Sequence, residues 1–315
     1  MKKHLLSIGL PVYNGERYFS KALDSLLNQD FKDFELIISD NGSTDQTEAI
    51  CRAAAAKDER IRYIRNDENR GATWNFRRVL ELSEGEFFKY AAHDDECYPT
   101  MLSRCMDVML RADPSVALVY TQSETIDENS LVVPRQGSTR WDSIATTANA
   151  APKRLWRVLW RVLNGQACYG VIRSSFLRRV RPFGSIAADW VILAQIAMLG
   201  KLVEVPEVLF RFRKHSANSW NGSSTPGKIL QWHNPEASKF ERALPFRVAV
   251  IWEHIKSVCY LPLSPADKMM CLPVACMAPP LRSVWIWLLG ETGPMRRFLR
   301  RVTGWKALHP SGLPN

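Results

Sequence analysis

One stretch, residues 87–99, constrains the fold of this chain more than any other. It reads FFKYAAHDDECYP, an apolar, aromatic run that ends in adjacent carboxylates. Such a run is typical of a buried strand, and Pro99 stops strand pairing in the loop that follows. In an open α/β sheet, ligands bind beyond the carboxyl ends of the strands. Neighbouring carboxylates at such an end repel each other unless a cation lies between them. Residues 94–96 therefore indicate either a divalent-metal site or a solvated acidic turn.

Strand and helix patterns alternate along the first 120 residues of the chain. Apolar runs typical of strands are followed by segments whose apolar residues recur at helical spacing. This alternation predicts an α/β fold with a mostly parallel central sheet flanked by helices. The expected strands lie at residues 5–12, 34–39, 61–64, 87–92 and 116–120.

Polar residues follow three of these expected strands, at positions 13–14, 40–41 and 93–95. Because the carboxyl ends of parallel strands meet at one edge of a sheet, the three groups predict a shared pocket. Neither a G-x-G-x-x-G fingerprint after the first strand nor a lysine-bearing phosphate loop occurs in the sequence. Their absence argues against a dinucleotide-binding or P-loop protein.

Positive charge is concentrated near the C-terminus. The 315 residues carry a formal net charge of +10, and residues 281–315 hold six Lys or Arg against one acid. Such a tail indicates an anionic partner, either phosphates or a membrane surface. The seven cysteines form no CxxC pair, which is typical of reduced thiols in a cytosolic protein. We expect no signal peptide and no membrane span, since no run reaches about 18 apolar residues.

An ordered set of motifs resembles the family 2 glycosyltransferases of the GT-A fold. The resemblance implies a glycosyltransferase domain over residues 1–220, with a nucleotide-binding half (1–130) and an acceptor-binding half (131–220). Residues 221–315 then form a helical, basic, aromatic-rich C-terminal extension. The motifs are PVYN at 11–14, DNGSTDQT at 40–47, NRG at 69–71, HDD at 93–95, NGQACYGVIR at 164–173, ADW at 188–190, GKLVEVP at 200–206 and RFRKH at 211–215.

The resemblance assigns a partner to each part of a nucleotide-sugar donor. It places Asp40 against a base N–H group, which favours a UDP-linked donor, although Asp40 could instead cap its own loop. It makes Asp95 and His215 ligands of Mn²⁺ or Mg²⁺, and an exposed basic loop is the alternative for His215. His93 stands where the family often has Asp, which weakens the acidic cluster. The residues implied to bind the donor are Pro11, Tyr13, Asn14, Asp40, Asn41, Arg70 and Asp94.

Asp189 is the residue that the resemblance implies as the catalytic base. An inverting transfer needs a base within hydrogen-bond reach of the acceptor hydroxyl. The family commonly has Glu or Ser before this aspartate, and here Ala188 stands in that place. The alternative interpretation is that Asp189 only caps the helix that follows it.

The resemblance implies an enzyme that moves a sugar from a nucleotide-sugar donor to a glycan or lipid-linked acceptor. Two other functions stay open: a sugar-phosphate nucleotidyltransferase, and a non-catalytic basic protein that binds phosphates or nucleic acid. We expect no nucleic-acid partner, because the basic residues do not interleave with aromatics on a recognisable module. We expect a cytoplasmic location. The basic, aromatic C-terminus suits either peripheral contact with the inner face of the membrane or an ordinary packed helical extension.

Overall fold

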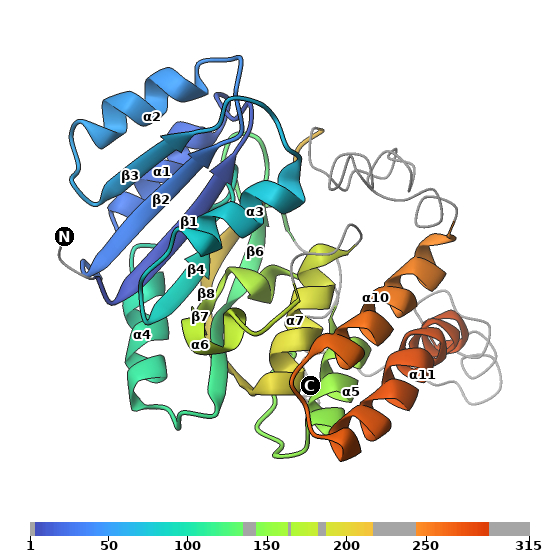
Figure 1. Ribbon diagram of the computed structural model, residues 1–315. Helices are drawn as coiled ribbons and strands as arrows, with labels where there is room; N and C mark the ends of the chain where they lie inside the picture. The colour runs from blue at the N-terminus through green and yellow to red at the C-terminus, as the bar shows by residue number, and fades with distance from the viewer. Residues whose placement is uncertain (1–3, 135–142, 163–164, 182–186, 217–243, 290–315) are drawn as a thin grey trace, which may run out of the picture.

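An eight-stranded sheet forms the centre of the described fold, and helices pack on both faces of this sheet (Figure 1). The structure is a computed structural model and describes residues 4–134, 143–162, 165–181, 187–216 and 244–289. The strand order is β3-β2-β1-β4-β7-β6-β8-β5.

The first half of the sheet is parallel. Strands β3, β2, β1 and β4 run side by side in one direction. Along the chain, one helix connects β1 to β2, another β2 to β3, and a third β3 to β4. This is the arrangement that the alternating pattern predicts. The elements of this half are β1 (Leu6–Val12), α1 (Phe19–Leu27), β2 (Phe34–Asp40), α2 (Thr47–Ala55), β3 (Ile61–Arg65), α3 (Ala72–Glu81), β4 (Phe87–Tyr90) and α4 (Met101–Arg111).

The second half of the sheet is mixed. Strand β7 (Val171–Arg173) is antiparallel to both β4 and β6 (Val116–Ile126), and β6 is parallel to β8 (Lys201–Arg213). Strand β5 (Glu96–Cys97) is antiparallel to β8 and forms the edge. Because β4, β6 and β8 therefore run in the same direction, the carboxyl ends of all three lie at the edge where β1 and β2 also end.

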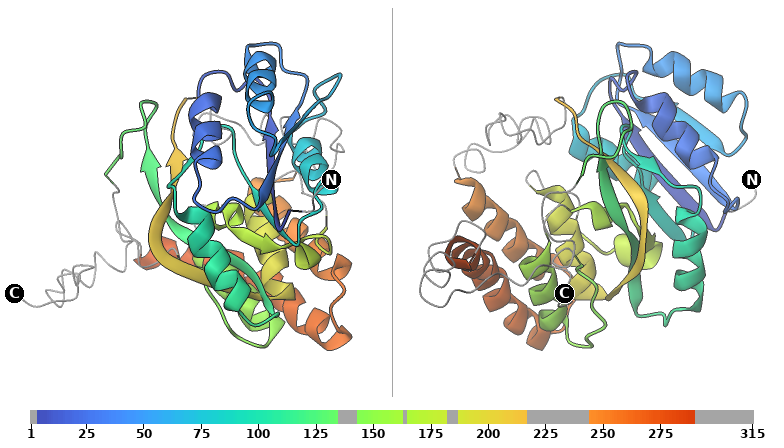
Figure 2. Two further views of the ribbon diagram at one scale, coloured as in Figure 1. Left: turned by 90° about the vertical axis from the view of Figure 1, so that its left-hand side faces the viewer. Right: turned by 180° about the vertical axis from the view of Figure 1, so that it is seen from behind.

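The sheet lies between two hydrophobic cores. Side chains alternate across a strand, so Leu6, Ile8 and Leu10 of β1 all face one core, which α1, α2 and α4 cover. Phe88 and Tyr90 of β4 face the other core. That side is covered by α3, α5 (Ala151–Arg161), α6 (Ser174–Leu177) and α7 (Ala188–Leu199), as Figure 2 shows from two further directions.

The predicted strands and helices of the first 120 residues are confirmed, with differences at their ends. Strand β6 continues to Ile126, well past the predicted residue 120. Within the motif at residues 164–173, the described residues form a 3₁₀ turn (Gln166–Tyr169) followed by the short strand β7. The two-residue strand β5 has no pattern of its own and forms because β8 pairs with it.

The C-terminal extension is helical where the structure describes it. Helices α10 (Phe246–Tyr260) and α11 (Pro265–Leu289) form a hairpin that packs on α5 and α7 (Figure 1). The proposed boundary at residue 220 and the arginine-rich residues 296–301 lie outside the described residues. None of the described helices combines the length and the apolar character that crossing a bilayer needs.

Candidate active site

The polar groups predicted to share a pocket all follow strands that end at the same edge of the sheet. Tyr13 follows β1, Asn41 follows β2, Asp94 lies beyond β4 and His215 follows β8. The 3₁₀ turn that precedes β7 begins at this edge too, because β7 runs in the opposite direction. The fold thus gathers these segments as the strand pattern predicts.

The loops after β1 and β2 are tied to each other by hydrogen bonds. Asn14, which has a left-handed backbone (φ 49°), accepts a hydrogen bond from the backbone N–H of Thr44 at 2.9 Å. The N–H of Asn14 in turn donates to the Ser43 hydroxyl, also at 2.9 Å. Asn14 therefore shapes the loop at residues 43–44 as well as its own, while Tyr13 beside it is 38% exposed. Pro11 is buried within β1.

Asp40 is fully buried, and protein groups occupy both of its carboxylate oxygens. Its Oδ1 accepts from the N–H of Ser43 at 2.9 Å, and its Oδ2 accepts from the Tyr63 hydroxyl at 2.9 Å. Asp40 thus caps its own loop, which is the alternative role that the sequence leaves open. A contact with a nucleotide base stays a prediction.

Asn41 and Arg70 meet at the turn that precedes α3. The buried Asn41 side chain donates to the Asn69 side chain at 2.8 Å and accepts from the N–H of Arg70 at 3.2 Å. The Arg70 side chain is 53% exposed and lies 3.4 Å from Glu68, itself exposed. Asn41 therefore holds the turn, whereas the Arg70 guanidinium pairs with Glu68, lies over the Trp74 ring at 5.0 Å and remains half exposed.

Asp94 and His215 are in direct contact although they are 121 residues apart in the chain. His215 Nε2 lies 2.9 Å from Asp94 Oδ2, and both side chains are largely buried. Burial acts to raise the pKa of Asp94, but the hydrogen bond with His215 and the charges of His93 and His215 hold it below its ordinary value. The His215 ring also packs on Tyr18, with ring centroids 4.7 Å apart. His215 is thus part of the site and not of an exposed loop.

Asp95 is buried beside Asp94. Its Oδ1 accepts the backbone N–H of Arg213 at 2.8 Å. Burial and the negative charge of Asp94 raise the pKa of Asp95 well above its ordinary value, against the opposing effect of that hydrogen bond. This is the electrostatic conflict that the sequence predicts for adjacent carboxylates at a strand end.

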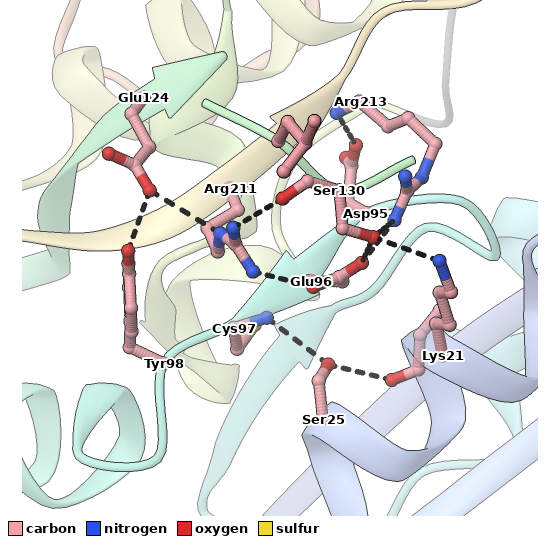
Figure 3. Close-up of polar contacts among 12 residues, drawn as sticks. Lys21, Ser25, Asp95, Glu96, Cys97, Tyr98, Glu124, Ser130, Arg211 and Arg213 are labelled. Atoms are coloured by element: carbon pink, nitrogen blue, oxygen red, sulfur yellow. Dashed lines mark hydrogen bonds and ion pairs between the residues drawn. The ribbon is translucent and has the colours of Figure 1, made fainter. Parts of the chain in front are cut away.

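A charged network holds β5 and β8 together next to this pair (Figure 3). The Arg213 side chain is fully buried; its guanidinium donates to Glu96 and, at 3.0 Å, to the Ser130 hydroxyl. Arg211 donates to the other oxygen of Glu96 at 2.8 Å. The Arg213 Nε–H also donates to the Asp94 carbonyl at 2.8 Å. Because removing one partner leaves a buried charge uncompensated, this network fixes the backbone that carries Asp94 and Asp95.

Asp189 lies in the first turn of α7. The N-cap position belongs to Ala187, so Asp189 does not occupy the capping position that the alternative interpretation gives it. Burial raises the pKa of Asp189 to about 6, opposed by hydrogen bonds from the N–H groups of Trp190 and of Asp189 itself. Its carboxylate lies against Gly165, where an added Cβ would be 2.0 Å from Asp189 Oδ2.

Tyr169 connects the two sides. It precedes β7, its ring stacks on Phe210 with centroids 5.3 Å apart, and its carbonyl accepts from the buried Lys89 ammonium at 2.7 Å. Burial raises the pKa of its phenol well above the ordinary value, and the negative charges of Asp95, Asp94 and Asp189 raise it further. The turn that ends at Tyr169 thus contacts β4 at one end, while Gly165 at its other end lies against Asp189.

Comparison with known proteins identifies the family. The family model described as "Glycosyl transferase family 2" matches residues 7–171, just over half of the chain. The chain belongs to this family.

Curated relatives of this family 2 glycosyltransferase match between about a third and two fifths of it. An uncharacterized glycosyltransferase of Rickettsia typhi is 35% identical over 126 residues, 40% of this chain and 38% of the relative. Chondroitin synthase of Escherichia coli is 33% identical over 129 residues, 41% of this chain and 18% of the synthase. A "GalNAc(5)-diNAcBac-PP-undecaprenol beta-1,3-glucosyltransferase" of Campylobacter jejuni is 36% identical over 102 residues, 32% of this chain and 33% of the relative. The chain thus spans less than two fifths of the length of these relatives.

Solved structures share the fold of this glycosyltransferase at low sequence identity. Residues 1–349 of S. aureus TarS, in complex with UDP-GlcNAc, give a TM-score of 0.64 at 16% identity, covering 94% of this chain and 78% of that one. The mannosyltransferase PcManGT of Pyrobaculum calidifontis, in complex with GDP-Man and Mn²⁺, gives 0.57 at 16% identity, covering 96% and 80%. The predicted GT-A fold is confirmed.

Glycosyltransferases of this fold commonly use a divalent metal, and the pair at the end of β4 suits one. Asp94, Asp95 and His215 offer carboxylate oxygens and an imidazole nitrogen, which are ligands of Mn²⁺ and Mg²⁺. A cation would also relieve the repulsion that raises the pKa of Asp95. In the described part of the chain, no group of three or more potential ligand side chains is arranged around one point. The remaining ligands would therefore come from donor phosphates and water.

Sequence reasoning missed several residues of the site in this glycosyltransferase. Arg213 lies in the RFRKH motif at residues 211–215, and strand alternation puts it on the same face as Arg211. Nothing in the sequence indicates that either arginine pairs with Glu96. Lys89 lies within an apolar run, where a charged residue is itself a signal, because a buried lysine needs partners. Tyr169 lies in the motif at residues 164–173, but nothing in the sequence gives it a role, and Tyr18 has no sequence signal at all. Contacts between distant segments define the positions of both.

Proposed function

We propose that this family 2 glycosyltransferase moves a sugar from a UDP-linked donor to a hydroxyl group of a glycan or lipid-linked acceptor, with inversion at the anomeric carbon. The carrying observation is that one short turn contacts both acidic segments. Gly165 at its start lies against the Asp189 carboxylate, and the carbonyl of Tyr169 at its end accepts from Lys89 of β4, the strand that leads to Asp95. An in-line displacement requires a group that holds the leaving diphosphate and a base that reaches the acceptor hydroxyl at the same donor. The UDP-GlcNAc complex of TarS and the GDP-Man and Mn²⁺ complex of PcManGT support a nucleotide-sugar donor.

On the donor side, the tied loops after β1 and β2 form the proposed nucleotide pocket. Pro11 and Asn14 fix the course of the first loop, and Tyr13, partly exposed, offers its ring as a surface for the base. Asp40 holds the second loop through Ser43 and Tyr63, and we assign the uracil N–H group to it or to the loop that it shapes. Arg70, exposed at the adjacent turn, is placed to meet a phosphate.

At the end of β4, Asp95 and His215 would hold Mn²⁺ or Mg²⁺, with Asp94 facing the ribose or a metal-bound water. When bound, the ion supplies positive charge that offsets the charge developing on the diphosphate leaving group. The buried Arg213 keeps these ligands in place through its N–H bond to Asp95 and its Nε–H bond to the Asp94 carbonyl.

Asp189 takes the proton of the acceptor hydroxyl. As that oxygen forms its bond to the anomeric carbon, the bond from the carbon to the diphosphate oxygen breaks, and the proton moves to the Asp189 carboxylate. A pKa of about 6 suits the role, because the group is ionised at pH 7 yet is a stronger base than an ordinary carboxylate.

A thermal-shift scan with UDP, GDP and TDP, each with and without Mn²⁺, tests the donor half of the proposal. We expect UDP with Mn²⁺ to raise the melting temperature, and UDP alone to raise it less. Release of UDP from a panel of UDP-sugars then identifies the sugar. A chain that responds to none of the nucleotides but is stabilised by DNA or RNA would instead be a non-catalytic phosphate-binding protein.

A further inference from the structure

The C-terminal hairpin exposes an unusual amount of apolar surface. Of the fourteen large hydrophobic side chains that are exposed in the described chain, seven lie on α10 and α11. Soluble surfaces rarely gather such side chains in one place, so the patch marks an interaction site. The seven are Val248, Trp252, Tyr260, Met269, Met270, Met277 and Leu281.

The exposed part of α11 forms one continuous apolar face. Met269, Pro273, Met277 and Leu281 recur every four residues, so they lie above one another along one side of the helix. All four are exposed, and Met269 is 69% exposed. No charged residue occurs in the sequence between Lys268 and Arg282. The opposite side of the helix is buried against its neighbours and includes Cys271, Ala275 and Ala278.

The charge beside this face is positive in the described part of the chain. Residues 244–289 hold four Lys or Arg and two Asp or Glu, and Lys268 and Arg282 bound the uncharged run at its two ends. Both acids are engaged within the protein. Glu253 is buried and paired with Arg181 and Lys256, and Asp267 accepts from the Ser264 hydroxyl at 2.8 Å. An anionic partner would therefore meet basic groups with little opposing charge.

We propose that the exposed face of α10 and α11 docks on an anionic lipid bilayer. Methionine, leucine and tryptophan side chains enter the boundary between headgroups and acyl chains, and the basic residues contact lipid phosphates. A second copy of the chain is a poorer partner, because pairing this face with itself would bring two positive segments together. The inference rests on the proposed function, since it explains how a lipid-linked acceptor reaches the enzyme.

The position of the hairpin supports this use. The first turn of α10 packs through Ala249 and Val250 against Ala187, the N-cap residue of the helix that carries Asp189. The hairpin that would meet a bilayer is therefore packed directly on the helix that carries Asp189. The proposed donor pocket at the sheet edge belongs to other elements, so donor binding should not require the bilayer.

Co-sedimentation of the full chain with vesicles tests the proposal. Wild-type protein should bind vesicles of phosphatidylglycerol and phosphatidylcholine at least tenfold more strongly than vesicles of phosphatidylcholine alone. Met269→Glu with Met277→Glu should weaken the binding to anionic vesicles at least tenfold. The matched control is Leu110→Glu with Val208→Glu, which also adds two charges at exposed apolar positions but lies on α4 and β8, and should change binding less than twofold.

Two further measurements make each outcome decisive. Nucleotide-dependent thermal shifts, which do not need lipid, should be the same in both double variants and thus show that they fold. Light scattering measures whether the wild type and the variants are monomers or dimers. The proposal is overturned if the methionine variant binds anionic vesicles as strongly as the wild type does. It is also overturned if neither protein binds vesicles while the wild type is a dimer and the methionine variant is a monomer, because the face would then be a dimer interface. Loss of vesicle binding with intact UDP binding supports it, and absence of UDP binding alone counts against the proposed donor and not against the docking face.

Discussion

The proposed donor side and the proposed acceptor side of this site hold their carboxylates in different ways. On the donor side, Asp40 is fixed by two protein donors, Ser43 and Tyr63, and the loops around it are cross-tied through Asn14 and Asn41. On the acceptor side, Asp189 has backbone N–H groups of its own helix turn and the bare backbone of Gly165 beside it. The first carboxylate has a structural role in its loop, whereas the second is buried with fewer protein donors.

This difference affects both the pKa of the carboxyl group and the stability of the fold. A carboxylate that is buried with few donors is less stable in its charged form, and its pKa rises for that reason. In the proposed role of Asp189, a pKa raised to about 6 would make it a stronger base than an ordinary carboxylate, at the expense of folding free energy at neutral pH. The comparison leads to four predictions, which separate a base from an anchor.

The largest effect is expected for Asp189→Asn. Because the amide cannot accept the acceptor proton, we expect transfer to fall by about 10²–10⁴-fold while the affinity for UDP with Mn²⁺ stays the same. Turnover of a UDP-sugar and a nucleotide titration measure the two quantities. Asp107→Asn, at an exposed position of α4, is the control. Full turnover in the Asp189 variant would make the base assignment wrong.

Asp95→Ala should act on binding instead. Removing a metal ligand is expected to weaken Mn²⁺-dependent UDP binding by about 10–100-fold, because the diphosphate loses its counterion. Calorimetric titration with and without Mn²⁺ measures it, and Asp33→Ala, an exposed carboxylate remote from the site, serves as control. Unchanged metal dependence in Asp95→Ala would remove this residue from the metal site.

Two glycine variants sharpen the comparison. Gly165 (φ +65°) and Gly42 (φ +73°) both have left-handed backbones, so alanine strains each by about 1 kcal/mol. At Gly165 the new Cβ would displace the Asp189 carboxylate, and we expect kcat to fall about tenfold with an unchanged KM for the donor. At Gly42 it would lie 3.0 Å from the backbone of Glu68, and the KM for the donor should rise instead. Identical kinetic effects of the two variants would contradict a division between the two sides.

The smallest effect concerns stability and needs no substrate. The folded protein holds the Asp189 proton up to about pH 6, whereas the unfolded chain releases it near 3.8. Stability therefore falls as pH rises through this window, and the loss is complete above it. The Asp189→Asn variant has no carboxyl group to ionise at this position, so it does not lose stability over this pH range. Its free energy of unfolding should therefore exceed that of wild type by about 1–3 kcal/mol at pH 7.5 and match it near pH 4. Urea denaturation at the two pH values measures the difference; equal stabilities at pH 7.5 would show that Asp189 is not destabilised by burial.

Much of the donor side could be predicted from sequence. Local patterns of apolar and turn residues located β1, β2 and β4, and the rule that ligands bind beyond parallel strand ends placed Asp40 and Asp94 at one edge. The role of Asp40 as a loop anchor was an open alternative, because its hydrogen bond to Ser43 is local. Its bond to Tyr63 on β3 depends on strand pairing, which no local pattern specifies.

The acceptor side was predicted less well, for a physical reason. Periodicity and turn chemistry arise from neighbours in the chain, and these determined the alternating strands and helices, the parallel half of the sheet and the acidic strand end. Only the tertiary structure decided that His215 meets Asp94, that Arg213 is buried against Glu96, and that Gly165 leaves room for Asp189. The first two contacts join segments more than 100 residues apart, and all three depend on how whole elements pack, which the sequence around each residue does not encode.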